Sequence, residues 1–356
     1  MFNIEEIDFN FKTENTLAPE VKAEYEFYDC EKPPFSIHGV FREGDCFVRL
    51  PKNVAQGVSE GVGRLYNLTV GGRVRFRTDS DRVAIAIKLP LRTADSRSAL
   101  TASTGLDLYA EDNGVERYFG TINPPCGFQG GFEGLFLQFP NKKMRTVTIN
   151  LPRENTVYKL FVGLKKGSNV EAAPTFQKPP VVYYGSSITQ GGCSSRPGTA
   201  YYSIIHRNID LDYINLGFSG NARGEDSIME YISGLDMSMF VYDYDHNAPS
   251  VQHLKNTHYK GYQKVRNAHP DIPILMLTRP KFYLNDEELA RLDVIKESYR
   301  TAIANGDNNV YFIDGRDMMD EEIREISLID HCHPTDCGFF GMARKILPVM
   351  REALGY

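Results

Sequence analysis

The spacing of apolar residues divides the chain into two parts. From residue 1 to about 172, apolar and polar residues alternate in short runs, such as Arg73-Val-Arg-Phe-Arg77 and Val83-Ala-Ile-Ala-Ile87. Residues 157–164 form a further, strongly apolar run. Clusters of Gly, Pro, Asn and Asp separate these runs. Short runs with a period of two, bounded by turn residues, predict an antiparallel β-sandwich, which we expect to be jelly-roll-like.

The pattern changes after residue 172. Three prolines between residues 173 and 180 prevent regular structure and indicate a linker. From 181 to 356, strand-like runs alternate with helix-like runs. The expected strands are 181–184, 213–216, 239–242, 272–277 and 310–313, and the expected helices are 199–208, 225–232, 251–268, 286–304 and 338–354. This alternation predicts a parallel sheet with helices on both faces, as in a flavodoxin-like three-layer α/β/α domain.

Length and composition agree with two soluble domains. The chain has 356 residues, 42% hydrophobic and 24% charged, with a formal net charge of -6. Because there is no basic surplus, nucleic acid is not an expected partner. No apolar run approaches the roughly 20 residues that span a bilayer, so no membrane association is expected.

The N-terminus and the cysteines bear on the compartment. The first eight residues are acidic and lack the basic and apolar regions of a signal peptide, so we expect a cytoplasmic protein. A secreted chain whose signal had been removed would look the same. The six cysteines are widely spread and form no CxxC pair, which favours reduced thiols over a disulfide framework.

The stretch Val181-Val-Tyr-Tyr-Gly-Ser-Ser-Ile-Thr-Gln-Gly-Gly192 carries the candidate chemistry. A buried strand that ends in a Gly/Ser turn presents its residues at the carboxyl edge of an open α/β sheet. Ser187 is therefore a candidate nucleophile, although the same residues would also suit a plain glycine turn. A serine hydroxyl needs a neighbouring base, usually a histidine that a carboxylate orients.

Three later loops follow successive expected elements and supply suitable groups. Gly220 could offer a backbone N–H, and the amide of Asn247 could donate to an oxyanion. Asp330 and His333 lie three residues apart just before the last helix, so the carboxylate can reach the imidazole. Each loop taken alone would also be an ordinary turn.

The last loop has a second interpretation as a metal site. His331, Cys332, His333 and Cys337 are all possible zinc ligands. Because no matching pair of ligands occurs elsewhere in the chain, we do not expect a metal.

Taken together, the loops resemble the SGNH (GDSL) hydrolase superfamily. The matching blocks are Gly185-Ser-Ser-Ile-Thr189, residues 215–220, Asn247, and Asp330 with His333-Pro334. The resemblance covers about residues 178–356. Gly105-Leu-Asp-Leu-Tyr109 resembles the signature of a branch with an N-terminal GxDLY-type β-domain. We thus expect a β-domain over 1–172, a linker over 173–180 and a catalytic domain over 181–356.

The resemblance implies a mechanism without metal or organic cofactor. Ser187 would attack an ester carbonyl, His333 would act as base and then acid, and Asp330 would orient His333. The N–H groups of Ser187 and Gly220 and the side chain of Asn247 would hold the oxyanion. Two departures leave the shape of the oxyanion hole open. Ser186 occupies the place of the family's usual Asp, and Asp245-His-Asn-Ala248 replaces Gly-x-Asn-Asp.

The predicted function is a serine esterase for O-acyl esters, chiefly acetyl esters, of carbohydrates or small molecules. An acyltransferase with the same Ser-His-Asp site is the alternative, and a non-catalytic carbohydrate-binding protein is a third possibility. Arg223, His246 and Arg279 stand on loops expected to face the site and are candidate substrate contacts. Rings at Phe128, Phe132 and Phe282-Tyr283 would suit either sugar stacking or core packing, and packing is favoured. The sequence predicts no oligomeric state.

Overall fold

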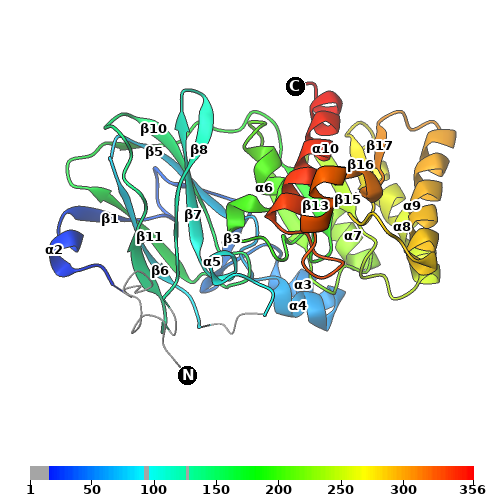
Figure 1. Cartoon of the computed structure of the whole chain (residues 1–356), viewed down its shortest axis with the longest axis horizontal. Coiled ribbons are helices and arrows are strands. Elements are labelled where there is room, and N and C mark those ends of the chain that lie inside the picture. The colour runs from blue at the N-terminus through cyan, green and yellow to red at the C-terminus, as the bar shows by residue number, and fades with distance from the viewer. Residues whose placement is uncertain (1–15, 92–95, 126–127) are drawn as a thin grey trace. The chain divides into compact units, whose positions relative to one another are not determined.

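The computed structural model describes residues 16–91, 96–125 and 128–356 (Figure 1). The chain divides into two compact units. The first runs up to Val48 and includes Asn67–Thr175 and Ser195–Gly198, and the second contains Arg49–Tyr66, Phe176–Ser194 and Thr199–Tyr356. Arg49–Tyr66 thus belongs to the second unit although it precedes the expected linker at 173–180, and Ser195–Gly198 belongs to the first unit although it follows that linker. Among the described helices, none is long and apolar enough to cross a membrane.

The first unit consists of antiparallel sheets (Figure 1). One sheet has the order β1-β11-β6-β9, with β1 at Tyr25–Asp29, β11 at Lys159–Lys165, β6 at Val83–Lys88 and β9 at Phe132–Leu135. The other has the order β12-β5-β10-β7-β8, with β12 at Val170–Glu171, β5 at Arg73–Thr78, β10 at Arg145–Asn150, β7 at Leu106–Asp112 and β8 at Val115–Ile122. Strand β2 (Ser36–His38) also pairs with β5, and β3 (Phe41–Glu43) pairs with β4 (Cys46–Val48).

The core of this unit lies between the two main sheets. Ile85 and Val162 of the first sheet and Phe76 and Ile149 of the second belong to one buried cluster. This arrangement confirms the expected sandwich, since alternate residues of both sheets face a shared interior. Short helices α2 (Pro19–Lys22) and α5 (Leu100–Ser103) complete the unit.

Phe128 and Phe132 also belong to this core. Both are buried, and their rings meet edge to face with centroids 5.5 Å apart. Their burial supports the packing interpretation over sugar stacking. The two residues before them, Cys126 and Gly127, lie outside the described residues.

The Gly-Leu-Asp-Leu-Tyr signature has a structural explanation within the first unit. The buried carboxylate of Asp107 accepts hydrogen bonds from the Arg196 guanidinium at 3.0 Å and from the Gly198 N–H at 2.8 Å. A Cβ on Gly198 would lie 2.5 Å from the Tyr109 ring. At Gly105, a Cβ would lie 2.4 Å from the carbonyl oxygen of Thr101. Asp107 and Tyr109 of the signature therefore contact the segment Ser195–Gly198.

The second unit contains a five-stranded parallel sheet with the order β14-β13-β15-β16-β17. The strands are β13 (Val181–Gly185), β14 (Tyr213–Gly217), β15 (Met239–Asp243), β16 (Ile274–Leu277) and β17 (Val310–Ile313). In chain order this is 2-1-3-4-5, the order of flavodoxin-like folds. The expected three-layer architecture is thereby confirmed.

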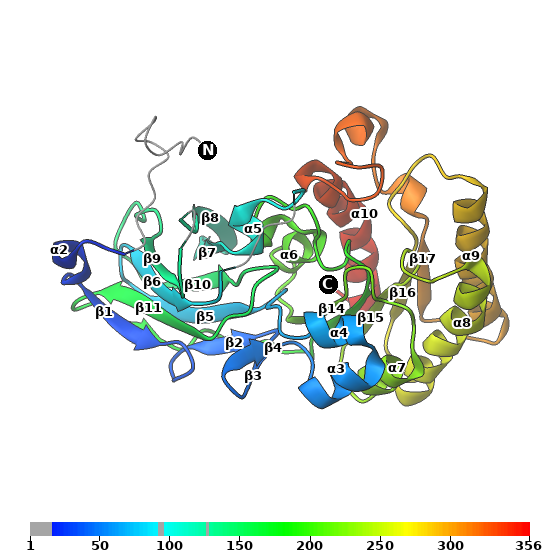
Figure 2. The ribbon, with the colours of Figure 1, turned by 90° about the horizontal axis from the view of Figure 1, so that it is seen from below.

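Helices cover both faces of this sheet. They are α6 (Tyr201–His206), α7 (Asp226–Ser233), α8 (Val251–Ala268), α9 (Asp286–Ala304) and α10 (Asp336–Leu354). Short 3-10 helices also occur at Gly315–Asp317 and Glu321–Ile326 of this unit, and at Pro197–Thr199, which begins in the first unit. Helices α6 and α10 lie on one face and α7, α8 and α9 on the other (Figures 1 and 2). Tyrosines fill much of the interior, among them the buried Tyr183, Tyr201 and Tyr242.

Besides the short α2 and α5, two further described helices occur where the sequence predicted only β structure. Helices α3 (Lys52–Val58) and α4 (Glu60–Leu65) belong to the second unit, and α3 packs on α7 (Figure 2). Three glycines within residues 52–65 weaken the helix signal, because glycine disfavours helix interiors. Burial of Ala55 and Val62 supplies the stabilisation that the local sequence lacks. The expectation that residues 1–172 are all β is therefore wrong for this segment.

Candidate active site

The candidate nucleophile sits in a tight turn after the central strand β13. A Cβ on Gly185 would lie 2.1 Å from the Thr189 hydroxyl and 2.3 Å from the carbonyl oxygen of Asp243 on β15, so only glycine fits. The Gly192 N–H donates to the Ser187 carbonyl at 2.7 Å and closes the turn. Ser187 itself is partly exposed, unlike its buried neighbours. The turn therefore holds one serine at the carboxyl edge of the sheet.

Ser187, His333 and Asp330 form a continuous chain of hydrogen bonds. The Ser187 Oγ lies 2.8 Å from His333 Nε2. On the other side of the ring, His333 Nδ1 lies 2.9 Å from Asp330 Oδ2 and 3.1 Å from Oδ1. A carboxylate facing Nδ1 favours the tautomer with its proton there, which leaves Nε2 free to accept the serine proton. The arrangement suits removal of a proton from Ser187.

The loop that carries Asp330 and His333 is fixed by its own backbone. Asp330 Oδ1 accepts the N–H groups of His333 at 2.8 Å and of Cys332 at 3.2 Å. The Ile329 N–H donates to the His333 carbonyl at 3.0 Å, which closes a narrow loop. At its end, Thr335 caps α10 by accepting the Gly338 N–H. The spacing of three residues thus brings the carboxylate beside the imidazole, as the sequence predicted.

The second loop is tied to the nucleophile turn. Asn215 Nδ2 donates to the Thr189 carbonyl at 2.7 Å, and the Ser219 N–H donates to Gln190 Oε1 at 3.0 Å. Gly220 follows, is exposed, and has a φ of +70°, a conformation that favours glycine. This loop therefore has a fixed relation to the turn of Ser187, and Gly220 stands at its open end.

A buried arginine from the N-terminal half of the chain supports the second loop. Arg49 Nη1 donates to the carbonyls of Asn215 and Gly217, both at 2.9 Å, and its guanidinium lies 5.0 Å from the centre of the Phe218 ring. Burial lowers the pKa of Arg49 to about 9. Sequence reasoning missed this residue, because a single arginine some 170 positions from its partners leaves no local pattern.

The third loop carries Asn247 and is held by a second arginine. Arg291 of α9 donates through Nη1 to the carbonyls of Asp245 at 3.1 Å and Ala248 at 3.0 Å. These two carbonyls lie on either side of Asn247 in the sequence. Asn247 is partly buried, and its Oδ1 has no hydrogen-bond partner among the described residues. The amide therefore stands in a loop that Arg291 holds on both sides, and its oxygen can accept a further hydrogen bond.

The residues predicted as substrate contacts differ in their surroundings. Arg279 is buried and donates to both oxygens of Asp245, at 3.0 and 2.6 Å, and to Glu288 at 2.9 Å. Burial opposes its charge, but the two carboxylates outweigh burial and raise the pKa of Arg279. Its hydrogen bonds thus serve the loop of Asn247. Arg223 is exposed.

His246 connects two of the loops. Its Nδ1 lies 3.7 Å from the Cys332 sulfur, and its Nε2 has no partner among the described residues. Burial lowers the pKa of His246 to about 4, so the ring is neutral near pH 7. A neutral ring that joins the loop of Asn247 to that of His333 would keep the two groups in register.

Ser186 and Asp243 show how the turn adapts to the missing family aspartate. The Ser186 hydroxyl accepts the Ile188 N–H at 3.1 Å, a bond that an aspartate could also accept. Asp243, at the end of β15, accepts the Thr189 hydroxyl at 2.8 Å. Burial raises the pKa of Asp243 to about 7, against the lowering by that hydroxyl. Ser186 therefore serves the backbone of the turn.

The alternative zinc site does not form as a cluster. Within the ranges that the structure describes, no group of three or more His, Cys, Asp or Glu side chains could hold a metal ion. His333 instead faces a serine and a carboxylate. The five described cysteines, Cys30, Cys46, Cys193, Cys332 and Cys337, are not joined in disulfide bonds.

Comparison with protein families gives two adjoining matches. Residues 177–351 match the GDSL-like Lipase/Acylhydrolase family, and residues 25–170 match the GxDLY model, the N-terminus of SGNH-hydrolase-type esterases. The two matches together cover both units. Comparison with curated proteins gives no match.

Solved structures show the same fold over nearly the whole chain. A candidate GDSL-like lipase from Bacteroides ovatus is 24% identical, with a TM-score of 0.83, and the match covers 93% of this chain and 98% of that one. A salicylyl-acyltransferase from a tetracycline biosynthetic pathway is 19% identical, with a TM-score of 0.74 and the same coverage. An acetyl xylan esterase from Butyrivibrio proteoclasticus is 13% identical, with a TM-score of 0.58 and coverage of 93% and 99%. The chain belongs to the GDSL-like lipase/acylhydrolase family of SGNH hydrolases, in the branch with a GxDLY-type β-domain.

Proposed function

We propose that the chain is a serine esterase that removes O-acyl groups, chiefly acetyl groups, from carbohydrates or small molecules. The observation that carries the proposal is the hydrogen-bonded series from Ser187 through His333 to Asp330, with distances of 2.8 and 2.9 Å. Ser187 attacks the ester carbonyl while His333 takes its proton. The charged imidazole then protonates the leaving alcohol. Water next attacks the acyl-enzyme, and His333 takes a proton from the water and returns it to Ser187 as the acyl group leaves.

Stabilisation of the oxyanion falls to three donors. They are the N–H groups of Ser187 and Gly220 and the side-chain amide of Asn247. The backbones of both loops, which Arg49 and Arg291 hold in place, support this role. Because such donors are held in place before reaction, they stabilise charge that appears only in the transition state.

Structural relatives and surface residues support the acetyl group and the carbohydrate. An acetyl xylan esterase and other carbohydrate esterases share the fold of this chain. Exposed Tyr283 and its neighbour Phe282, whose rings meet edge to face, remain candidates for sugar stacking in the second unit. Arg223, His246 and Arg279 remain candidate substrate contacts, and the ion pairs of Arg279 favour a supporting role.

The proposal is tested by acetate release from a panel of substrates. Purified protein should release acetate from aryl acetates and from acetylated mono- and oligosaccharides, and its rate should fall as the acyl chain lengthens. Prior treatment with a metal chelator should leave the rate unchanged. Turnover restricted to long-chain esters would contradict the deacetylase proposal, and turnover of no ester would contradict the esterase proposal.

Acyl transfer to another alcohol is the second candidate function. The fold is shared with a salicylyl-acyltransferase, and both reactions pass through the same acyl-enzyme. The two differ only in the group that attacks this intermediate. Product analysis with an added alcohol or sugar acceptor distinguishes them, because a transferase forms a new ester faster than it releases free acid.

The loop of Asn247 offers a test of positioning. Arg291→Met leaves the carbonyls of Asp245 and Ala248 without their shared donor, so the loop can shift. We expect kcat for an aryl acetate to fall about 10–100-fold with little change in KM, because misplaced donors weaken transition-state binding more than substrate binding. Steady-state kinetics measure the two constants separately.

Arg266→Met is the matched control for this test. Arg266 donates to the carbonyls of His269, Pro270 and Ile272, at the other edge of the sheet. The control should lower thermal stability but leave kcat near that of the wild type. Equal losses of kcat in both variants would mean that Arg291 acts only through general stability.

A further inference from the structure

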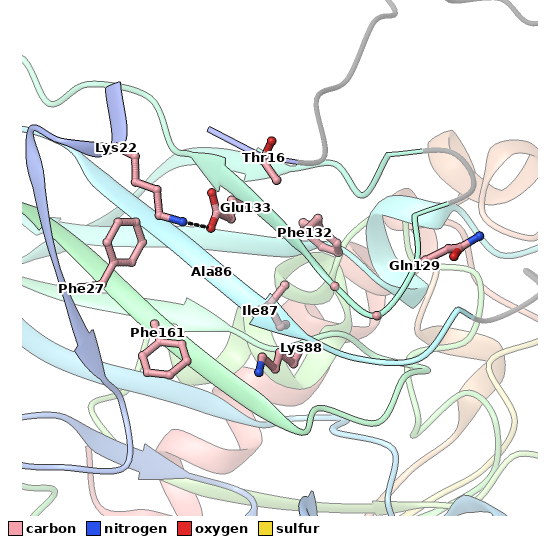
Figure 3. A pocket seen from close by; sticks show the side chains of 12 residues that line it. Thr16, Lys22, Phe27, Ala86, Ile87, Lys88, Gln129, Phe132, Glu133 and Phe161 are labelled. Carbon is pink, nitrogen blue, oxygen red and sulfur yellow. Dashed lines mark hydrogen bonds and ion pairs between the residues drawn. The ribbon is translucent and has the colours of Figure 1, made fainter. Parts of the chain in front are cut away.

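The first unit has a groove on the outer face of the sheet β1-β11-β6-β9 (Figure 3). The cavity measures about 530 Å³, within the range of about 300–1,000 Å³ that is usual for ligand sites. It is made wholly of residues of the first unit. Neither the proposed esterase site nor the sequence patterns described above account for it.

Two phenylalanine rings form one side of the groove. Phe27 on β1 and Phe161 on β11 are partly exposed and lie side by side (Figure 3). Phe27 pairs with Gly163 on the neighbouring strand, and a Cβ on Gly163 would lie 2.9 Å from the Phe27 ring. The glycine therefore lets the ring lie low against the sheet. Ala86, which pairs with Phe161, has a small side chain and so leaves room above the adjoining floor of the groove.

Each ring has an ion pair beside it. The Lys22 ammonium lies 5.7 Å from the centre of the Phe27 ring and pairs with Glu133 across the groove (Figure 3). The Lys159 ammonium lies 5.9 Å from the centre of the Phe161 ring and pairs with Asp29 at 2.9 Å and Glu31 at 2.6 Å. Hydrogen-bond donors and acceptors thus stand next to both aromatic surfaces.

The rim continues with further polar groups. Lys88 is exposed at the end of β6, and Gln129 stands at the far end of the groove (Figure 3). Gly131 brings its loop close to β6, since a Cβ there would lie 2.1 Å from the Ile87 carbonyl oxygen. The groove therefore has an aromatic side, a small-residue floor and polar ends.

This combination selects one class of ligand. A sugar ring presents an apolar C–H face, which packs on an aromatic ring, and hydroxyl groups around its edge, which both donate and accept hydrogen bonds. Because Lys22 and Lys159 are each paired with carboxylates, an anionic surface has little net charge to attract it. An alkyl chain would desolvate both ion pairs without giving them new partners.

We propose that this groove is a non-catalytic binding site for a neutral oligo- or polysaccharide chain. Phe27 and Phe161 stack against successive sugar rings. Lys22, Glu133 and Gln129 form hydrogen bonds with sugar hydroxyls. The inference is independent of the esterase chemistry, since the groove contains no nucleophile or base of that site.

The experiment uses the full chain carrying Ser187→Ala, so that acetylated ligands survive. Electrophoresis in native gels containing soluble arabinoxylan, glucomannan or mixed-linkage β-glucan should show retardation by at least one of these neutral polysaccharides. Calorimetric titration with oligosaccharides of the retarding type then gives the dissociation constant. Phe27→Ala and Phe161→Ala, each added to this chain, should raise that constant about tenfold or more, and the pair together should abolish retardation.

Two further variants keep the test decisive. Ala86→Glu places a charged side chain on the floor without removing a ring and should also prevent binding. Phe41→Ala removes a phenylalanine that is 41% exposed on β3, outside the groove, and should leave binding unchanged. Thermal unfolding shows whether each variant is folded.

Several results would overturn the proposal. One is the absence of retardation by every polysaccharide in the panel. Another is retardation that all three groove variants leave intact, which would assign glycan binding to another surface. Binding of a fatty acid, or self-association at rising protein concentration, would also overturn it if the groove variants remove that binding and no glycan binds.

Discussion

Ser187→Ala should lower kcat for ester hydrolysis about 10⁶-fold, and His333→Gln should lower it by a similar factor. The Ser187 Oγ and His333 Nε2, 2.8 Å apart, exchange one proton in a single step. Removing either group removes that step. The double variant should therefore be no slower than either single variant, because residues that act as a unit have non-additive effects. Single-turnover kinetics with an aryl acetate measure all three rates.

Neighbouring residues of the same type supply the controls. Ser186→Ala removes a hydroxyl that accepts the Ile188 N–H, and His331→Gln changes an exposed loop residue. Both should retain most of the wild-type rate. Loss of activity in His331→Gln together with inhibition by a chelator would instead support a metal site. Multiplied losses in the double variant would show that Ser187 and His333 act separately.

The fold of the second unit was predictable because its signals are local. Each strand of its sheet is a short, largely apolar run, four of the five runs lead into a Gly or Asp, and helices α8 and α9 span the predicted residues 251–268 and 286–304. The sequence pattern did not predict helices α3 and α4. Their short, glycine-containing sequences gain stability from packing in the second unit, which a local pattern does not reveal.

The same distinction applies to the candidate site. Ser187, Asp330 and His333 each stand in a recognisable turn, and the parallel sheet brings those turns to one edge. Arg49 and Arg291 do not stand in any motif, yet each holds the backbone of a loop through two carbonyl groups. Their roles depend on partners distant in sequence. Phe27 and Phe161 were missed for a related reason, since their exposure follows from the small residues of neighbouring strands.

Asp330→Asn should lower kcat about 10⁴-fold while the loop keeps its shape. Asp330 Oδ1 accepts the N–H groups of Cys332 and His333, and an asparagine oxygen can keep both bonds. The asparagine NH₂ then occupies the place of Oδ2, 2.9 Å from His333 Nδ1. Because two donors cannot face each other, Nδ1 must become the acceptor and the proton moves to Nε2. That nitrogen then donates to Ser187 and can no longer take its proton.

Asp330→Ala separates this effect from the support of the loop. The alanine variant loses the two backbone bonds as well as the partner of Nδ1, so its thermal stability should fall, whereas that of Asp330→Asn should stay near the wild-type value. Asp271→Asn, at an exposed position of the same unit, should change neither rate nor stability. Nitrogen NMR of His333 should report the Nδ1-protonated tautomer in the wild type and the Nε2-protonated tautomer in Asp330→Asn. A rate within tenfold of the wild type in Asp330→Asn, with the tautomer changed, would mean that His333 is not the base.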